Sequence, residues 1–135
     1  MIIFSNEIIG YINLFEKITK THVKSCFFDE DILVFIVGPS ELGKALGKQG
    51  ANIRKLGNLF NKKLKLLEYN PNPKRFIANL IYPIKAEEIR LEDDIIKIKA
   101  ANNKEKGQIY GREKSNFKKI KNIFAKFFSF QIEIE

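Results

Sequence analysis

Apolar and polar positions follow two different periods along the first half of the chain. Apolar side chains recur at three- and four-residue spacing, typical of amphipathic helices, in residues 6–20, 41–46 and 51–60. Shorter runs rich in β-branched and aromatic residues predict strands at 23–28, 32–37 and 64–67. The acidic turn DED separates the first two strands and indicates a hairpin. The predicted order is therefore α-β-β-α-α-β.

The second half of the chain repeats the first at an offset of 64 residues. GKALGKQGANIRKLGNLF (43–60) falls on GQIYGREKSNFKKIKNIF (107–124), so that Gly47 meets Gly111. We expect the same offset upstream, where Ile32 and Val34 meet Ile96 and Ile98. The second copy then has helices at 74–82, 103–110 and 115–127, and strands at 84–91, 95–101 and 129–135. The prolines of PNP (71–73) mark the joint, which predicts two domains, 1–70 and 71–135.

Two glycine signatures overlap between residues 37 and 57. GPSELGK, from Gly38 to Lys44, is nearly the phosphate loop of nucleotide hydrolases, but Ala45 stands where a hydroxyl is needed to hold magnesium. The second signature, GKQG, joins two short predicted helices. Such a loop turns the N-terminal N–H groups of its second helix toward an extended nucleic-acid backbone, and its glycines allow a phosphate to approach closely. The sequence therefore favours GKQG over the nucleotide loop.

The element order, the stretch GKALGKQGANIRKL and its diverged copy together resemble the prokaryotic-type (type II) KH domain. The tandem pair resembles the archaeal NusA-like transcription factors, and this resemblance covers nearly the whole chain. It implies an α/β fold of the α+β type, with two tandem KH domains that each contain a three-stranded mixed sheet. The first domain carries an intact GxxG loop and the second a diverged loop, GREK.

The resemblance also implies an RNA-binding groove for about four single-stranded nucleotides. We expect the groove between the helix pair and the strand 32–37. By position in the motif, the phosphate contacts are Gly47, Lys48, Gln49 and Gly50. The apolar lining for the bases is Ala45, Leu46 and Ile53. Arg54 and Lys55 are candidates for the RNA backbone, with one of the two expected to point at the strand.

The second loop departs from the motif, because Lys114 replaces its closing glycine. We expect the Lys114 side chain to occupy the place of a phosphate. The residues of a possible second RNA site are Gly111, Arg112, Lys114, Lys118 and Tyr110, the last as a stacking face. Two interpretations stay open: a structural and electrostatic support, or a weaker and less specific second site, which we favour.

Charge is concentrated in two blocks of the chain. The whole sequence has 24 basic and 16 acidic residues, a net charge of +8. Residues 40–70 hold seven basic against two acidic residues and residues 102–135 hold eight against four, which favours a polyanionic partner. The single cysteine, Cys26, excludes an internal disulfide and suggests a reducing, cytoplasmic compartment. No apolar run approaches the ~18 residues of a membrane span. Because the basic residues follow helices of a folded repeat and not a tail, we also expect no binding to a membrane surface.

Chemistry-bearing residues are sparse. The one histidine, His22, lies in a polar turn, and the carboxylates of 87–94 belong to a predicted hairpin, so we expect no enzyme, no metal and no cofactor. The predicted function is single-stranded RNA binding in transcription elongation, termination or antitermination. The alternative is a protein-interaction module that docks on RNA polymerase or a ribosomal particle, with RNA contact secondary. RNA sequence preference and oligomeric state are not determined by the sequence.

Overall fold

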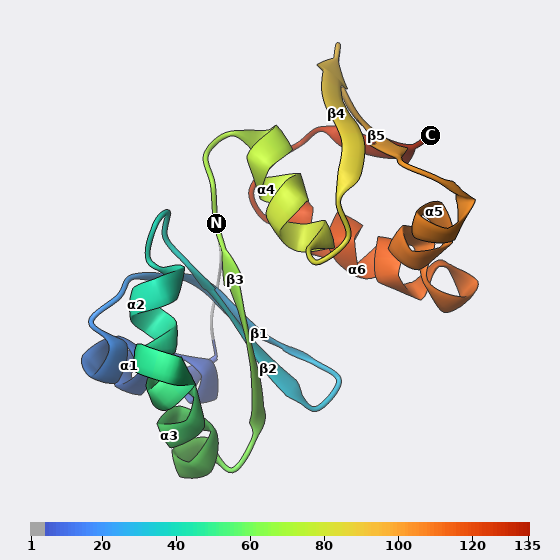
Figure 1. Ribbon diagram of the computed structural model, residues 1–135. Helices are drawn as coiled ribbons and strands as arrows, with labels where there is room; N and C mark the ends of the chain where they lie inside the picture. The colour runs from blue at the N-terminus through green and yellow to red at the C-terminus, as the bar shows by residue number, and fades with distance from the viewer. Residues whose placement is uncertain (1–4) are drawn as a thin grey trace. The chain divides into compact units, whose positions relative to one another are not determined.

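The computed structural model describes residues 5–135, and the chain divides into two compact units, Met1–Asn70 and Pro71–Glu135 (Figure 1). Both units have the element order predicted from the sequence. The first contains α1 (Asn6–Thr19), β1 (Val23–Asp29), β2 (Ile32–Val37), α2 (Leu42–Leu46), α3 (Ala51–Phe60) and β3 (Lys63–Glu68). The second contains α4 (Pro73–Ile81), β4 (Ala86–Glu92), β5 (Ile95–Ala100), α5 (Asn103–Tyr110), α6 (Ser115–Phe124) and β6 (Gln131–Ile134). A 3-10 turn precedes the third helix of each unit. Lys48–Gly50 lies before α3, and Arg112–Lys114 lies before α6.

Each unit contains one three-stranded mixed sheet, as predicted. In the first, β1 pairs antiparallel with β2, and β2 pairs parallel with β3. The second repeats this arrangement with the order β4-β5-β6. A parallel pair cannot be closed by a tight turn and needs a crossover. The crossover in each unit is the pair of helices that carries the glycine loop.

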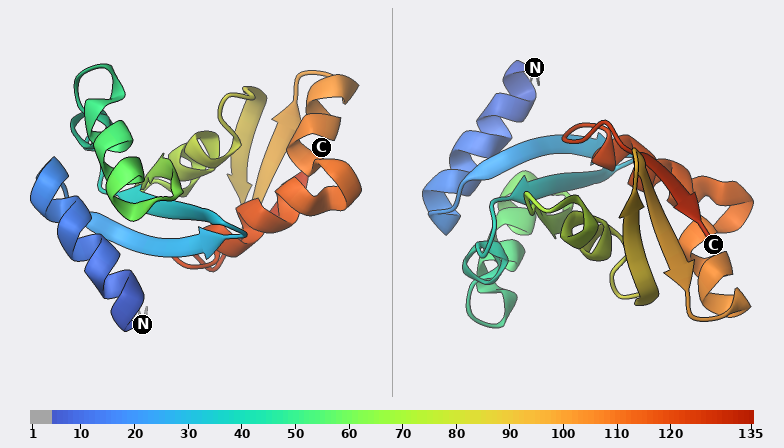
Figure 2. Two further views of the ribbon diagram at one scale, coloured as in Figure 1. Left: turned by 90° about the horizontal axis from the view of Figure 1, so that it is seen from below. Right: turned by 90° about the horizontal axis from the view of Figure 1, so that it is seen from above.

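The core of the first unit lies between its sheet and its helices, which cover one face of the sheet (Figure 2). The rings of Phe15 in α1 and Phe35 in β2 are fully buried and stack with their centroids 4.1 Å apart. Leu56 from α3 closes the same cluster. Burial of such side chains contributes roughly 1.5–3 kcal/mol each, so this cluster fixes α1 and α3 on the sheet that supports the loop.

Phe76 and Phe124 are buried in the core of the second unit, and the partly buried Phe127 and Phe128 pack beside them. Phe76 of α4 lies within 5.4–6.2 Å, ring centroid to centroid, of Phe124, Phe127 and Phe128. The helix expected over 115–127 ends at Phe124, and the amide of Phe127 donates to the Phe124 carbonyl in a turn. The turn brings the later rings onto α4 without a longer helix.

The repeat is displaced by one residue in the hairpins, so the expected upstream offset of 64 is wrong. Val23 pairs with Val37 and Ala86 with Ala100, which sets an offset of 63. The turn residues Glu30 and Asp93 share a positive φ, 56° and 53°. A strand that slips by one residue turns every side chain to the opposite face. Leu33, buried in β2, therefore corresponds to the buried Ile96.

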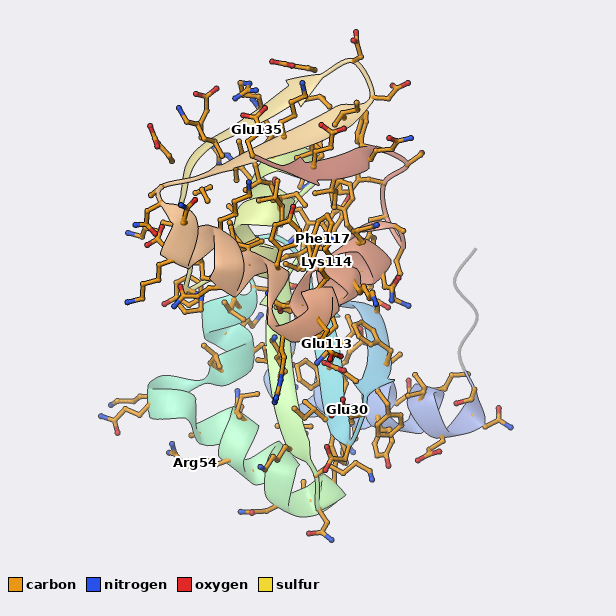
Figure 3. The ribbon with its side chains drawn as sticks, turned by 90° about the vertical axis from the view of Figure 1, so that its right-hand side faces the viewer. Glu30, Arg54, Glu113, Lys114, Phe117 and Glu135 are labelled. Atoms are coloured by element: carbon orange, nitrogen blue, oxygen red, sulfur yellow. The ribbon has the colours of Figure 1, made fainter. Side chains whose placement is uncertain are left out.

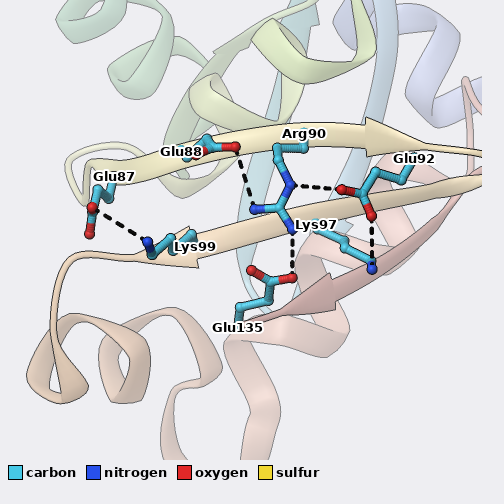
Figure 4. A network of polar contacts seen from close by, with 7 residues as sticks. All are labelled: Glu87, Glu88, Arg90, Glu92, Lys97, Lys99 and Glu135. Atoms are coloured by element: carbon cyan, nitrogen blue, oxygen red, sulfur yellow. Dashed lines mark hydrogen bonds and ion pairs between the residues drawn. The ribbon is translucent and has the colours of Figure 1, made fainter.

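The carboxylates of β4 take part in an ion-pair network on one strand face (Figure 4). Arg90 lies 2.8 Å from Glu135 and 3.0 Å from Glu92, and Lys97 lies 3.0 Å from Glu92. Hydrogen bonds from Lys97 and then Arg90 lower the pKa of Glu92, and the bond from Arg90 lowers the pKa of Glu135. Any stability that these carboxyls contribute is present above their ordinary pKa and is lost as the pH falls through the depressed value. The expected solvated hairpin is thus confirmed for these exposed residues.

The thiol of Cys26 is 3% exposed, and burial raises its pKa to about 12. Because the thiolate is the reactive form, we expect alkylation of the folded protein at pH 8 to be at least about a hundredfold slower than that of a free cysteine. Mass spectrometry after timed iodoacetamide exposure measures this rate, and full modification in guanidinium chloride is the control. Rapid modification of the folded chain would contradict the packing.

Candidate nucleic-acid interface

The GKQG loop has a backbone conformation that requires glycine at its first position. Gly47 has φ 75° and ψ 175°, a combination that residues with a side chain essentially do not adopt. A Cβ on Gly47 would also lie 2.8 Å from Cγ of Asn52. Gly50, at φ 74° and ψ 19°, is left-handed as well and begins α3. The loop therefore lies tightly against the start of α3.

Helix α3 begins without a side-chain cap. Elsewhere in the chain, side chains of Ser5, Asn72 and Asn102 accept hydrogen bonds at the starts of α1, α4 and α5. Gly50 has no side chain to do so. The first N–H groups of a helix lack intrahelical acceptors, and the helix dipole adds positive potential there. This end of α3 is therefore suited to an anionic oxygen, such as that of a phosphate.

Two side chains of α3 fasten the loop from the helix side. Asn52 Nδ2 donates to the Lys44 carbonyl at 3.2 Å. The guanidinium of Arg54, which is labelled in Figure 3, donates to the Gln49 carbonyl. Arg54 is therefore the member of the Arg54–Lys55 pair that lies against the loop. Lys48 and Gln49 are exposed at the tip.

An open hollow of about 640 Å³ lies between α3 and β3, next to Arg54. Its lining residues are Ile53, Arg54, Gly57, Asn58, Asn61, Lys62, Lys63 and Leu64. Ile53 is thus partly exposed beside this hollow. Leu46 is also exposed, by 36% of its surface.

Two expectations about the groove need correction. We expected its sheet wall to be 32–37, but β2 is the central strand and its residues from Leu33 to Val37 are all buried. The strand that borders the hollow is β3. Ala45 is fully buried in the core cluster and has no surface left to contact a base. The run of consecutive apolar residues in 32–37 was the signal of a strand that is buried along most of its length.

The diverged loop of the second unit has the same conformation as the first. Gly111 lies at φ 71° and ψ 178°, Glu113 at 53° and 32°, and Lys114 at 62° and 19°. Asn116 Nδ2 donates to the Ile109 carbonyl at 3.0 Å and to the Gln108 carbonyl at 3.5 Å. Gln108 stands at the position of Lys44, whose carbonyl accepts from Asn52 in the first unit. Lys114 therefore adopts the left-handed conformation of Gly50, at a cost of about 1–2 kcal/mol for a residue with a Cβ.

The aromatic surface beside the second loop is occupied by the unit's own lysines. Figure 3 labels Lys114 and Phe117, one member of each contact. The Lys114 ammonium lies 5.7 Å from the centre of the Tyr110 ring, and Lys121 lies 5.1 Å from that of Phe117. Tyr110 and Phe117 also contact each other edge to face at 5.4 Å. The Lys114 side chain is thus directed over Tyr110, where it competes with a stacking base. Arg112 and Lys118 are exposed.

One residue of GREK, Glu113, matters for charge and is not among the site residues expected from the sequence. Glu113 stands at the loop tip where the first unit has Gln49, with the same left-handed backbone. A carboxylate at this position repels phosphate. The sequence already indicated this difference, because the neutral amide Gln49 of GKQG is aligned with the acidic Glu113 of GREK.

Metal-binding clusters and membrane-spanning helices are both absent from residues 5–135, the part of the chain that the structure describes. These residues hold no group of three or more His, Cys, Asp or Glu side chains that could bind a metal ion. Across the same residues, every helix is too short or too polar to cross a bilayer.

Known proteins resemble this chain over most of its length. A family model described as "KH domain" matches residues 10–102. "Probable transcription termination protein NusA" of Methanocaldococcus jannaschii is 27% identical over 125 residues, 90% of this chain and 68% of that protein. Its counterpart in Thermoplasma acidophilum is 25% identical over 130 residues, 92% of this chain and 88% of that protein.

Two further matches differ in how much of each protein is covered. The protein of the same name from Methanococcus vannielii is 38% identical over 85 residues, which are 63% of this chain; the chain spans only 49% of that relative. A crystal structure of the protein APE1850 has a TM-score of 0.77 and 27% identity, covering 98% of this chain and all of that one.

The glycine at the start of each loop gives a test of its geometry. We expect Gly47→Ala or Gly111→Ala to lower the free energy of unfolding by about 1–3 kcal/mol, because alanine is strained at this φ and ψ. Gly43→Ala is the matched control, since Gly43 lies in α2 with nothing within 4 Å of an added Cβ. Equilibrium urea unfolding measures all three variants. Equal stability of Gly47→Ala and Gly43→Ala would show that the loop conformation is wrong.

Proposed function

The chain belongs to the KH-domain family, and from this premise we propose that it binds single-stranded RNA through the GKQG loop of its first unit. The observation that carries the proposal is the start of α3. Two left-handed glycines lead into a helix whose first N–H groups have no side-chain cap. The Ala51 amide donates to the Lys48 carbonyl. We propose that an RNA phosphate accepts from the amides that follow it at the start of α3, and that glycine leaves room for the phosphate.

Charge supports a polyanionic ligand at the same place. Lys48 is exposed at the loop tip, and Arg54 and Lys63 line the neighbouring hollow. Each phosphate that these cations neutralise releases counterions, so the affinity should fall steeply as the salt concentration rises. The mechanism is one of positioning: the loop holds the backbone, and the groove beside α3 receives unstacked bases.

We further propose that the two units are tandem type II KH domains with unequal roles. The matching loop conformations support a common origin for both. Arg112 and Lys118 can attract RNA in the second unit, whereas Lys114 and Lys121 cover its aromatic rings and Glu113 opposes phosphate at the tip. The second unit therefore binds more weakly and with less selectivity than the first.

The proposed biological role is that of a non-enzymatic transcription factor acting on nascent RNA at termination or antitermination. It is supported by the similarity to archaeal relatives named as probable transcription termination proteins. RNA polymerase is the proposed protein partner. Transcription of a terminator template by an archaeal polymerase, with and without the protein, tests this role by the fraction of read-through product.

The first prediction for this proposal concerns Gly50→Asp, which places a negative charge against the phosphate. We expect at least about a tenfold loss of affinity for mixed-sequence single-stranded RNA, the size of one charge-assisted contact. Fluorescence anisotropy at several salt concentrations measures the affinity. Gly10→Asp is the matched control, because it adds the same charge to α1, where an added Cβ has nothing within 4 Å.

Three outcomes separate the alternatives. Loss of binding in Gly50→Asp but not in Gly10→Asp supports the first loop as the site. Survival in Gly50→Asp with loss in Lys114→Asp moves the site to the second unit. If neither variant weakens RNA binding, the protein-interaction alternative replaces RNA recognition as the main function. The same holds if a variant that has lost RNA binding still associates with RNA polymerase.

A further inference from the structure

The hollow between α3 and β3 continues the loop surface toward the end of α3. Arg54 connects the two, because its guanidinium donates to the Gln49 carbonyl in the loop and it also lines the hollow. We propose that this hollow is a subsite for one unstacked nucleobase and that the carboxamides of Asn58 and Asn61 read its edge. This inference rests on the proposed RNA binding and adds which residues discriminate between bases.

The lining has the composition that a base requires. Ile53 and Leu64 offer apolar contact to a ring face, while Asn58 and Asn61 lie along the same hollow. A carboxamide both donates and accepts hydrogen bonds, so it matches a base edge that presents a donor beside an acceptor. The volume of about 640 Å³ lies within the roughly 300–1,000 Å³ of small-molecule sites. The site is thus large enough for a base with its sugar.

The charge around the hollow suits the nucleotide that carries the base. Three of its lining residues are the cations Arg54, Lys62 and Lys63, and no carboxylate is among them. The Lys62 ammonium lies 5.4 Å from the centre of the Phe28 ring in β1, which is not part of the lining, so Arg54 and Lys63 are the cations that remain for a bound nucleotide. The phosphates on either side of a bound base would therefore meet positive charge.

The second unit has a smaller hollow, of about 310 Å³, at the corresponding place between α6 and β6. No asparagine is among its lining residues, which are Lys121, Phe124, Ala125, Phe130, Gln131 and Ile132. At the offset of 64, Lys121 replaces Gly57, Phe117 replaces Ile53 and Ala125 replaces Asn61. The Lys121 ammonium lies over the Phe117 ring and covers the face that a base would use. The first unit consequently supplies base discrimination, and the second supplies attraction that does not depend on sequence.

Gly57 also has a structural role, which decides the choice of variants. The Lys62 amide donates to the Gly57 carbonyl at 3.2 Å, and a Cβ on Gly57 would lie 3.4 Å from the Lys62 carbonyl oxygen. A substitution there would disturb the turn as well as fill the hollow. The two asparagines give cleaner tests. Asn58 is exposed on a helix, where alanine is favourable, and Asn61 has φ 53°, which glycine adopts easily.

The experiment compares wild-type protein with the double variant Asn58→Ala/Asn61→Gly. Affinities are measured for single-stranded oligo(A), oligo(C) and oligo(U) of equal length. We expect the wild type to rank these homopolymers. The double variant should bind the preferred one at least about fivefold more weakly, while the least preferred one changes by no more than about twofold. Asn122→Ala, at the position of Asn58 in α6, is the matched control and should keep the wild-type ranking.

The outcomes distinguish failure of the subsite from failure of RNA binding. If the wild type does not discriminate, or if the double variant keeps the wild-type ranking, the base subsite is wrong. The loop proposal then stands as long as Gly50→Asp removes binding. If the wild type binds none of the homopolymers and no mixed-sequence RNA, both proposals fail together. A ranking lost equally in Asn122→Ala would transfer discrimination to the second unit and also overturn the inference.

Discussion

The parallel pairing of β2 with β3 is the constraint from which the architecture of the interface follows. Two parallel neighbours cannot be joined by a short turn, so the chain must cross the sheet before the second strand begins. Here the crossover consists of two short helices, and the loop between them is its sharpest bend. The bend needs the φ and ψ that only glycine accepts at Gly47. The start of α3 is thereby left exposed on the surface.

Much of this fold could be predicted because its periodicities are clear. The helices and strands lie within a few residues of their expected places, and the alternation of periods fixed their order. The hairpin offset could not be obtained by comparing the two halves of the sequence. Ile32 matches an isoleucine at either offset, Ile95 at 63 or Ile96 at 64, and only the pairing of the strands decides between them. The end of α6 was also missed, because Phe127 satisfies a helical pattern while its amide forms a turn.

The candidate site was predictable in its loop and less so in its groove. The motif GKQG predicts the backbone conformation of the loop directly, because glycine is the residue that such a bend needs. The wall of the groove depends on which strand is at the sheet edge, and a local pattern does not give strand order. The burial of Ala45 has the same cause: its depth is set by packing on Phe35 and Leu56 in one cluster, which are distant in sequence.

In both loops, the residues that fix the backbone conformation are not the residues that set the charge of the loop tip. Gly111 and Asn116 keep the second loop in the shape of the first, although three of the four tip residues differ. An internally duplicated protein with loops of this kind can change one copy without unfolding it. A substitution at the tip of one loop can then change its charge while the backbone conformation is kept. The asparagine behind each loop is thus a basis for the evolutionary divergence of the pair.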